Sequence, residues 1–318
     1  MIKQVIPVFF ACDDNYAPLL ATAIKSLLKN ASKKHLYKIH ILTTGFNKEN
    51  ADKLLDLQDE KSRIIFEDMS EVIETYGDKL HTRGYYSVAT YYRLFIADVF
   101  TRYDKALYFD SDMIFLGDVS RLYYLDLNGN LVAAVQENIM QEDIFGYYVE
   151  KVLGVNRRDY FNAGMLVMDL KAMREERLGQ KFVDLIRVKT YTVTQDQDYL
   201  NVLCKGRVLM LGYEWNFMPI EGLCSKRPQI VHFKLTMRPW KYDGILYERH
   251  FWKFARLAGY YKQLKAIFDN FTFADRMKDK LMCKNLALTA LRQAREADPT
   301  VPLNENGYVG IRATQFSY

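Results

Sequence analysis

The 318-residue sequence predicts an α/β fold in which a mostly parallel sheet carries helices on both faces. Short apolar runs of strand length alternate with amphipathic stretches of helical spacing over about the first 245 residues. Apolar residues make up 49% of the chain, enough for a full core. No window approaches the roughly 20 consecutive apolar residues that a membrane span requires. These observations indicate a globular chain with one large sheet.

The expected elements follow in chain order. Strands are predicted at six apolar runs, residues 4–11, 37–42, 63–66, 105–109, 131–135 and 165–168. Helices are predicted between them, at residues 18–29, 48–57, 89–99, 171–187 and 196–203. Asn15 is the expected N-cap of the first helix, and Pro18 is compatible with a first helical turn. Beyond residue 245 the pattern changes to two aromatic, basic helices, 247–268 and 273–294, followed by a tail over 298–318.

Charge and cysteine usage exclude several classes of protein. The net charge of +5 is mild, and Lys and Arg are spread among acidic residues, which argues against nucleic-acid binding. Cys12, Cys204, Cys224 and Cys283 lie far apart and form no Cys-x-x-Cys pair, so neither a structural zinc site nor a disulfide framework is expected. The first residues show no signal-peptide cleavage pattern. A cytoplasmic protein with reduced thiols is the prediction.

Acidic residues follow two of the predicted strands. Asp13, Asp14 and Asn15 come after the first strand, and Asp110 and Asp112 come directly after strand 105–109. In α/β sheets of this kind, ligands bind outside the carboxyl ends of the strands. We therefore expect both groups to lie at one edge of the sheet.

The segment 105–118, KALYFDSDMIFLGD, carries two carboxylates separated by one residue. A hard divalent cation such as Mn²⁺ or Mg²⁺ would offset their repulsion, although a polar turn would also explain the pattern. His232, in IVHFKLTMRPW, follows an apolar run and is either a third metal ligand or a structural histidine. Arg238, six positions later, has the fixed charge and geometry to hold a diphosphate.

Two further segments are rich in hydrogen-bonding groups. FNAG (161–164) and TQDQDYLN (194–201) contribute Asn162, Asp196, Gln197 and Asp198, which could fix the hydroxyls of a sugar. Helix capping near Thr194 and a turn at Asn162 are the alternative interpretation.

Taken in order, these segments closely resemble glycosyltransferase family 8. The resemblance rests on FACDDNYAPLLATAIKSLL, TYYRL, LYFDSDMIFLGD, YFNAGMLVMDL, QDQDYLN, WNFMP and HFKLTMRPW, and covers roughly residues 3–241. This retaining group includes glycogenin and bacterial lipopolysaccharide galactosyl- and glucosyltransferases. The resemblance implies a GT-A catalytic domain over residues 1–245, with a donor-binding half at about 1–115 and an acceptor-binding half at about 116–245. Residues 246–318 would form a helical C-terminal extension.

The resemblance also implies roles for individual residues. Asp110, Asp112 and His232 would bind Mn²⁺ (or Mg²⁺), and Ser111 would belong to the same donor site. The other residues implied in donor binding or catalysis are Asp13, Asn15 and Tyr16 at the uracil, Arg93 at the donor sugar or diphosphate, Glu137, Asn162, Asp196 and Gln197 at the sugar, and Arg238 at the phosphates. Leu235 departs from the family pattern, because it replaces a glycine that normally approaches the phosphates.

The expected activity is retaining, Mn²⁺-dependent transfer of galactose or glucose from a UDP-sugar to a glycan or lipid-linked glycan, as in lipopolysaccharide biosynthesis. Same-face attack is favoured over double displacement through Gln197 or Asp196, since a neutral amide is a poor nucleophile. A metal-dependent phosphohydrolase and a non-catalytic nucleotide-sugar-binding module are the alternatives. The basic, aromatic helices after Tyr247 would either contact the inner face of a membrane or simply pack against the catalytic domain. No oligomeric state is predicted.

Overall fold

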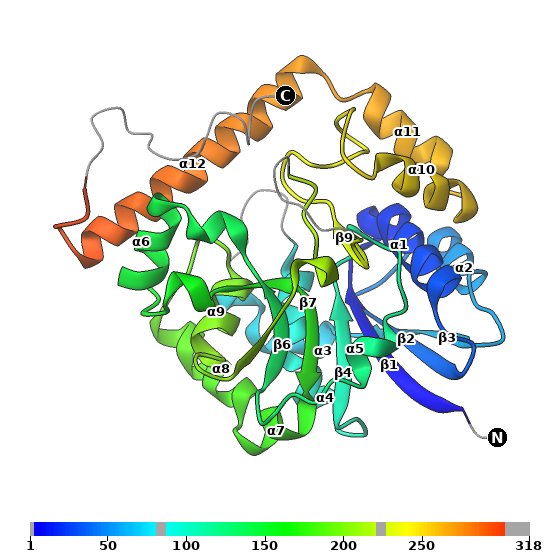
Figure 1. Cartoon of the computed structure of the whole chain (residues 1–318), viewed down its shortest axis with the longest axis horizontal. Helices are drawn as coiled ribbons and strands as arrows, with labels where there is room; N and C mark the ends of the chain where they lie inside the picture. The colour runs from blue at the N-terminus through cyan, green and yellow to red at the C-terminus, as the bar shows by residue number, and fades with distance from the viewer. Residues whose placement is uncertain (1–2, 81–86, 221–226, 303–318) are drawn as a thin grey trace.

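The computed structural model describes residues 3–80, 87–220 and 227–302. Its centre is a seven-stranded sheet in the order β3-β2-β1-β4-β7-β6-β8 (Figure 1). These strands are β1 (Gln4–Ala11), β2 (His35–Thr43), β3 (Ser62–Asp68), β4 (Lys105–Phe109), β6 (Val132–Gln136), β7 (Phe161–Asp169) and β8 (Val208–Leu211). Strands β1 to β4 pair in parallel, as do β6 and β8, whereas β7 runs antiparallel to both β4 and β6. The predicted mostly parallel sheet is confirmed.

A small antiparallel ribbon joins β5 (Met113–Phe115) to β9 (Ile230–His232). In its register Met113 lies opposite His232. The ribbon therefore places a segment just after β4 beside one that is more than a hundred residues later in the chain. The sequence did not predict β5 or β8, which have only three and four residues.

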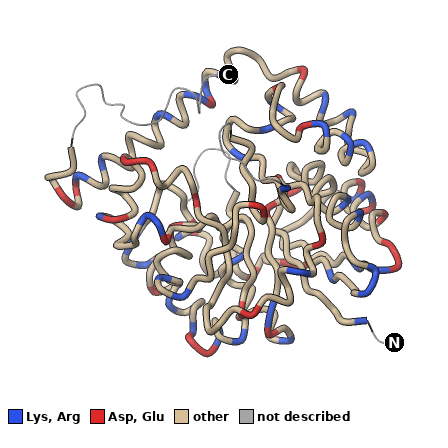
Figure 2. The backbone as a smooth tube through the Cα atoms, viewed as in Figure 1, with Lys and Arg blue, Asp and Glu red and all other residues tan. Residues whose placement is uncertain are grey.

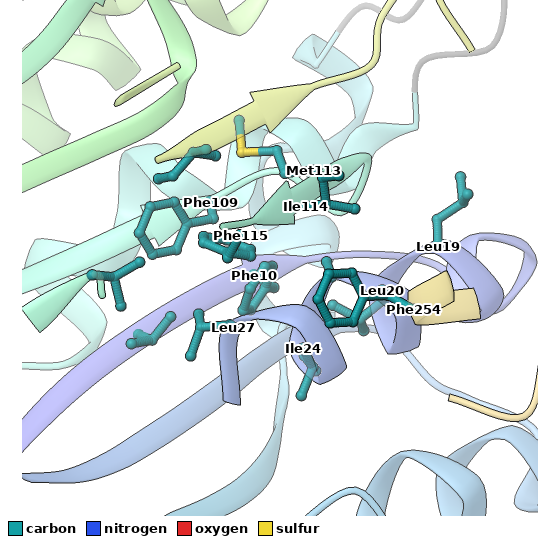
Figure 3. Packing of buried hydrophobic residues seen from close by; sticks show 14 of the residues in the cluster. Phe10, Leu19, Leu20, Ile24, Leu27, Phe109, Met113, Ile114, Phe115 and Phe254 are labelled. Carbon is teal, nitrogen blue, oxygen red and sulfur yellow. The ribbon is translucent and has the colours of Figure 1, made fainter. Parts of the chain in front are cut away.

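Helices cover both faces of the sheet because side chains of a strand alternate between its faces. In β1, Val8 and Phe10 belong to one hydrophobic cluster and Phe9 to the other. The first cluster includes α1 (Ala17–Asn30) and α10 (Glu248–Leu257), and Figure 3 shows Phe10 and Phe254 within it. The second cluster is lined by α4 (Ile96–Val99), α6 (Asp143–Lys151), α7 (Leu170–Glu175), α8 (Leu178–Val188) and α9 (Asp196–Leu203). The remaining short helices are α2 (Lys48–Leu55), α3 (Ser70–Tyr76) and α5 (Ser120–Tyr123).

The C-terminal helices cross the top of the molecule in the view of Figure 1. There, α11 (Tyr261–Asp269) follows α10, and α12 (Phe273–Ala297) continues from α11 to α6. Thr272 and Asp275 form a capping box at the start of α12. Because Ala287, Ala290 and Ala294 are small and buried, α12 packs closely against the catalytic domain.

Four details of the predicted elements were wrong. Asn15 is not the N-cap of α1: its backbone N–H donates to Asp13, and Tyr16 precedes α1 without a side-chain cap. Residues 88–95 form a 3₁₀ helix before α4. The predicted helix 171–187 breaks at Arg177, whose φ of 54° lies in the left-handed region. The predicted helix 247–268 breaks at Gly259, whose φ is +81°.

Among the described residues, no helix has both the length and the apolarity that crossing a membrane demands. Cys12, Cys204 and Cys283 are buried and have free thiols. Some predictions concern residues outside the described ranges. These are residues 81–86 of the predicted donor-binding half, residues 221–226 of the predicted acceptor-binding half, which include Cys224, and residues 303–318 of the expected tail.

Candidate active site

A cavity opens at the carboxyl ends of β1 and β4, as the fold class predicts. Its lining contains most of the residues singled out in the sequence: Asp13, Tyr16, Arg93, Asp110, Ser111, Asp112, Glu137, Asn162, Asp196, Gln197, His232 and Arg238. Asn15 is exposed and does not line it. Asp14 instead accepts hydrogen bonds from Asn47 and Asn50, so it fixes the start of α2.

Two carboxylates and one imidazole converge in this cavity. Asp110 directly follows β4, Asp112 directly precedes β5, and His232 ends β9. The pairing of β5 with β9 brings the imidazole to the carboxylates, so that His232 Nε2 lies 3.1 Å from Asp112 Oδ1 and 3.9 Å from Asp110 Oδ2. Ligand atoms of all three residues lie within 4.8 Å of one another. Oxygen and nitrogen ligands at this spacing fit a divalent cation such as Mn²⁺.

The orientation of His232 is set by a second layer of amides. His232 Nδ1 lies 3.0 Å from Asn216 Oδ1, and the Asn216 amide donates to Asn162 Oδ1 at 2.8 Å. A hydrogen bond at one ring nitrogen aims the other nitrogen at a metal in many metal sites. Burial raises the pKa of Asp112, but the neighbouring His232 and Arg238 outweigh burial and hold that pKa below its ordinary value. The Asp112 side chain is therefore an anion at neutral pH.

Gly164 in β7 allows this close packing. Its carbonyl accepts a hydrogen bond from the Asp110 backbone N–H at 2.8 Å. A Cβ at this position would lie 2.5 Å from His232 Cε1, 2.6 Å from Asp110 Oδ2 and 3.0 Å from Asn162 Oδ1. The backbone of β7 is therefore part of the wall behind the metal-binding candidates.

Arg93 connects the two acidic groups of the cavity, at Asp110 and at Asp196. Its Nη2 lies 2.9 Å from Asp110 Oδ1, and its Nε lies 3.1 Å from Asp196 Oδ2. The guanidinium also stacks 4.4 Å from the centre of the Tyr108 ring. Burial lowers the pKa of Arg93, but Asp110 and Asp196 more than compensate and raise it overall. One buried cation thus serves two carboxylates.

Asp196 is the first residue of α9 and is buried. Burial raises its pKa to about 6, although Arg93 opposes the shift; Asp110 adds to it.

The Gln197 amide is hydrogen-bonded at both its oxygen and its nitrogen. Gln197 Oε1 accepts from the Ala163 backbone N–H at 3.0 Å and from Asn162 Nδ2 at 3.2 Å, and its Nε2 donates to Tyr160 at 3.3 Å. The amide is therefore held rigidly beside the cavity.

Asp198 has a different environment from its neighbours Asp196 and Gln197. It does not line the cavity, and it accepts hydrogen bonds from the hydroxyls of Tyr148, Tyr160 and Thr194. The expectation that Asp198 faces a sugar is therefore wrong, because this carboxylate is buried behind the site and braces it.

Sequence reasoning missed several lining residues. An apolar wall consists of Ile139, Met140, Phe145 and Leu286. Leu286 belongs to α12, so the C-terminal extension contributes directly to the cavity. Lys234, from the segment after β9, also lines it, next to Leu235, which the sequence analysis had placed near the phosphates. The sequence did contain a signal for the lysine, because it is a charged residue two positions after His232. The apolar residues had no such signal.

Comparison with known proteins identifies the family. The family model described as "Glycosyl transferase family 8" matches residues 7–244, about three-quarters of the chain. The chain belongs to glycosyltransferase family 8.

Relatives and solved structures of this family agree. A lipopolysaccharide 1,2-glucosyltransferase of Escherichia coli K12 is 26% identical over 280 residues, which are 79% of this chain and 80% of the relative. The galactosyltransferase LgtC, solved with donor and acceptor sugar analogs, is 26% identical with a TM-score of 0.66, covering 79% of this chain and 96% of LgtC. The bifunctional glycosyltransferase WbbM, solved without ligand, is 26% identical with a TM-score of 0.74, covering 84% of this chain but 52% of WbbM. The fold is therefore the GT-A fold of nucleotide-sugar glycosyltransferases, as the resemblance implied.

Proposed function

We propose that this family 8 glycosyltransferase transfers a hexose, galactose or glucose, from a UDP-sugar to a glycan acceptor, with retention at the anomeric carbon. The observation that carries the proposal is the convergence of Asp110, Asp112 and His232 beside a hydrogen-bonding pocket in one cavity. The triad suits a metal that binds a diphosphate, and the wall of amides beside it suits a sugar, for which Gln197 Nε2 keeps one N–H beyond its bond to Tyr160. A simple phosphohydrolase would need the triad but not the amides.

The donor would lie along the cavity from Asp13 to Gln197. We assign Asp13 and Tyr16, which line the end near β1, to the uracil, together with the neighbouring Asn15. Asp110, Asp112 and His232 would hold Mn²⁺ or Mg²⁺, with Ser111 between the two carboxylates. Such an ion would stabilise the charge on the departing diphosphate. Arg238 lines the cavity with a buried side chain and adds a fixed positive charge for the phosphates.

The environment of Gln197 and Asp196 supports same-face attack over double displacement. Gln197 Oε1 already accepts two hydrogen bonds, and Asp196 Oδ2 is paired with Arg93. These contacts make both oxygens weaker nucleophiles toward an anomeric carbon. In the proposed step the bond between the anomeric carbon and the diphosphate oxygen breaks, and the diphosphate keeps the electron pair. The acceptor oxygen bonds to the same face, and its proton passes to the departing phosphate oxygen. Detection of a sugar bound covalently to either residue in the wild-type protein would refute this mechanism.

The acceptor would contact the apolar wall of Ile139, Met140, Phe145 and Leu286. Apolar side chains pack well against the C–H faces of a sugar ring or against a lipid carrier. One relative is named as a lipopolysaccharide glucosyltransferase. A glycan or lipid-linked glycan is therefore the acceptor class that we propose.

We further propose that α12 rests on the cytoplasmic face of a membrane. One face of this helix packs on α6, and the other exposes Phe273 (77%), Leu281 (56%) and Met277 (48%) at helical spacing. Figure 2 shows Lys and Arg residues along α10, α11 and α12, which would be attracted to anionic lipids. Flotation with anionic vesicles should recover the wild-type protein, and Phe273→Ser/Leu281→Ser should reduce the recovery. Equal recovery of both proteins would contradict this proposal.

The activity is tested by incubating the protein with Mn²⁺ and a panel of UDP-sugars and measuring released UDP. Slow hydrolysis of the preferred donor is expected without acceptor. The Asp110→Ala/Asp112→Ala variant and chelation should both abolish it. Release of UMP or phosphate would favour the phosphohydrolase, and donor binding without turnover, even with glycan acceptors, would favour a binding module. Absence of any donor binding would refute the proposal.

A further inference from the structure

A buried ion pair spans the cavity between two segments that are far apart in sequence. Glu137 directly follows β6, and Lys234 lies two residues beyond β9. The Lys234 ammonium contacts Glu137 Oε2, and both residues line the cavity. Their side chains are 15% and 3% exposed, so the pair lies inside the cavity and not at its rim.

The hydrogen bonds of the pair leave the lysine with spare donors. Glu137 Oε2 accepts from Lys234 and from Asn162 Nδ2 at 2.7 Å, and Oε1 accepts from the Ile139 backbone N–H at 3.3 Å. Burial raises the pKa of Glu137, but Lys234 and these hydrogen bonds lower it by more than burial raises it. The net pKa is below the ordinary value, so the carboxylate stays charged. An ammonium has three N–H donors. One is directed at Glu137, which leaves two for a ligand in the cavity.

The same network places the pair at the sugar end of the donor site. Asn162 binds Glu137 on one side and, at its Oδ1, Asn216, which contacts His232. Asn162 also donates to Gln197. If a diphosphate occupies the His232 side, as the proposed function requires, the sugar attached to it reaches Asn162 and the ion pair.

We propose that Lys234 is a specificity-determining residue that donates hydrogen bonds to a hydroxyl of the transferred sugar, with Glu137 as its buried anchor. The inference rests on the proposed UDP-sugar donor and restricts its sugar to an uncharged hexose. The protein side chains of the cavity are acidic on balance, because the carboxylates of Asp13, Asp110, Asp112, Glu137 and Asp196 outnumber the cations Arg93, Lys234 and Arg238. A uronic acid would therefore bring a further carboxylate into an already acidic site.

A purely structural role for Lys234 makes a different prediction. Leu235, the next residue, has a φ of 54°, a strained conformation for a leucine, and Arg238 follows in the same segment. If Lys234 only holds this segment in place, its loss should weaken binding of UDP and of UDP-sugars equally. A contact to the sugar should weaken only the UDP-sugars.

The two roles are separated by calorimetric titration of UDP, UDP-galactose, UDP-glucose and UDP-glucuronic acid in the presence of Mn²⁺. Lys234→Met should bind UDP within about twofold of wild type but lose about tenfold or more in affinity for the preferred UDP-hexose. Wild type should bind UDP-glucuronic acid more weakly than that hexose. The matched control is Lys241→Met, which removes a lysine that pairs with Asp279 and does not line the cavity; it should retain both affinities.

Equal losses for UDP and the UDP-hexose, or no loss, would overturn the inference, as would preference for UDP-glucuronic acid. Lys234→Met/Glu137→Gln removes both charges and should show the same selective loss if the single variant folds poorly. Failure of the wild type to bind UDP at all would instead overturn the proposed function. The two failures are therefore distinguishable.

Discussion

Gly164→Ala should weaken the binding of Mn²⁺ while the protein stays folded. The added Cβ would lie 2.5 Å from His232 Cε1 and 2.6 Å from Asp110 Oδ2, whereas ordinary contacts of a Cβ lie at 3.4–4 Å. Each of the two side chains must therefore move about 1 Å away from the added Cβ, which exceeds the tolerance of about 0.2 Å in metal–ligand distances. Affinity for Mn²⁺ should fall about 10- to 100-fold, the range found when groups that orient ligands are altered.

The assay is titration of Mn²⁺ into protein with UDP, alongside thermal unfolding. Overpacking should lower the free energy of unfolding by about 1–3 kcal/mol, which leaves the protein folded. Gly206→Ala is the control, since its φ is +73° with no atom within 4 Å of the added Cβ. It should cost about 1–2 kcal/mol in backbone strain with no loss of metal affinity. Unchanged Mn²⁺ affinity in Gly164→Ala would refute the placement of the metal between Asp110 and His232.

Three other substitutions probe the surroundings of the site. In Lys234→Met, burial should raise the pKa of Glu137 above its unfolded value, so the variant loses stability as pH rises through that pKa. The difference in Tm from wild type should widen as pH rises above the unfolded pKa of a glutamate, about 4.3; a constant difference would contradict the buried pair. Asp198→Asn should lower the free energy of urea unfolding by about 2–3 kcal/mol, because one amide cannot accept all the hydrogen bonds of the carboxylate. Glu49→Gln, at an exposed ion pair, should change it far less; equal effects of the two substitutions would contradict the role of Asp198 in bracing the site. Leu235→Gly should change the same quantity by less than about 1 kcal/mol, since relief of left-handed strain offsets the lost side chain; a larger loss would mean that Leu235 is not strained.

The elements that could be predicted are those with a local signal. Strands β1 and β4 and helix α9 begin and end where expected, because each has an apolar or amphipathic run with a clear end. Strand β7 is longer than predicted, since Asn162 and Gly164 are poor strand formers. Side-chain hydrogen bonds from Asn201 to the backbone of Phe161 hold that segment to α9. Such a long-range contact has no local trace in the sequence.

The residues of the site also separate into those with a local signal in the sequence and those without one. Asp13, Asp110 and Asp112 were expected together because they follow the carboxyl ends of adjacent parallel strands. The apolar run before His232 predicted a strand end there, but the approach of His232 depends on pairing of β9 with β5, a three-residue strand too short to identify from periodicity. The inward position of Asp198 could not be predicted either, because alternate residues at a helix start look alike until the packing partners are known.

The position of Arg93 has a consequence for the protein without metal. The carboxylates of Asp110, Asp112 and Asp196 line one cavity and would repel one another without a positive charge between them. The guanidinium of Arg93 already bridges Asp110 and Asp196. Arg93 therefore holds these two carboxylates in place by itself, and a metal ion bound as proposed would meet Asp110 already positioned. If the site binds a metal ion and a donor as proposed, the cavity walls would not have to reassemble around them at each turnover.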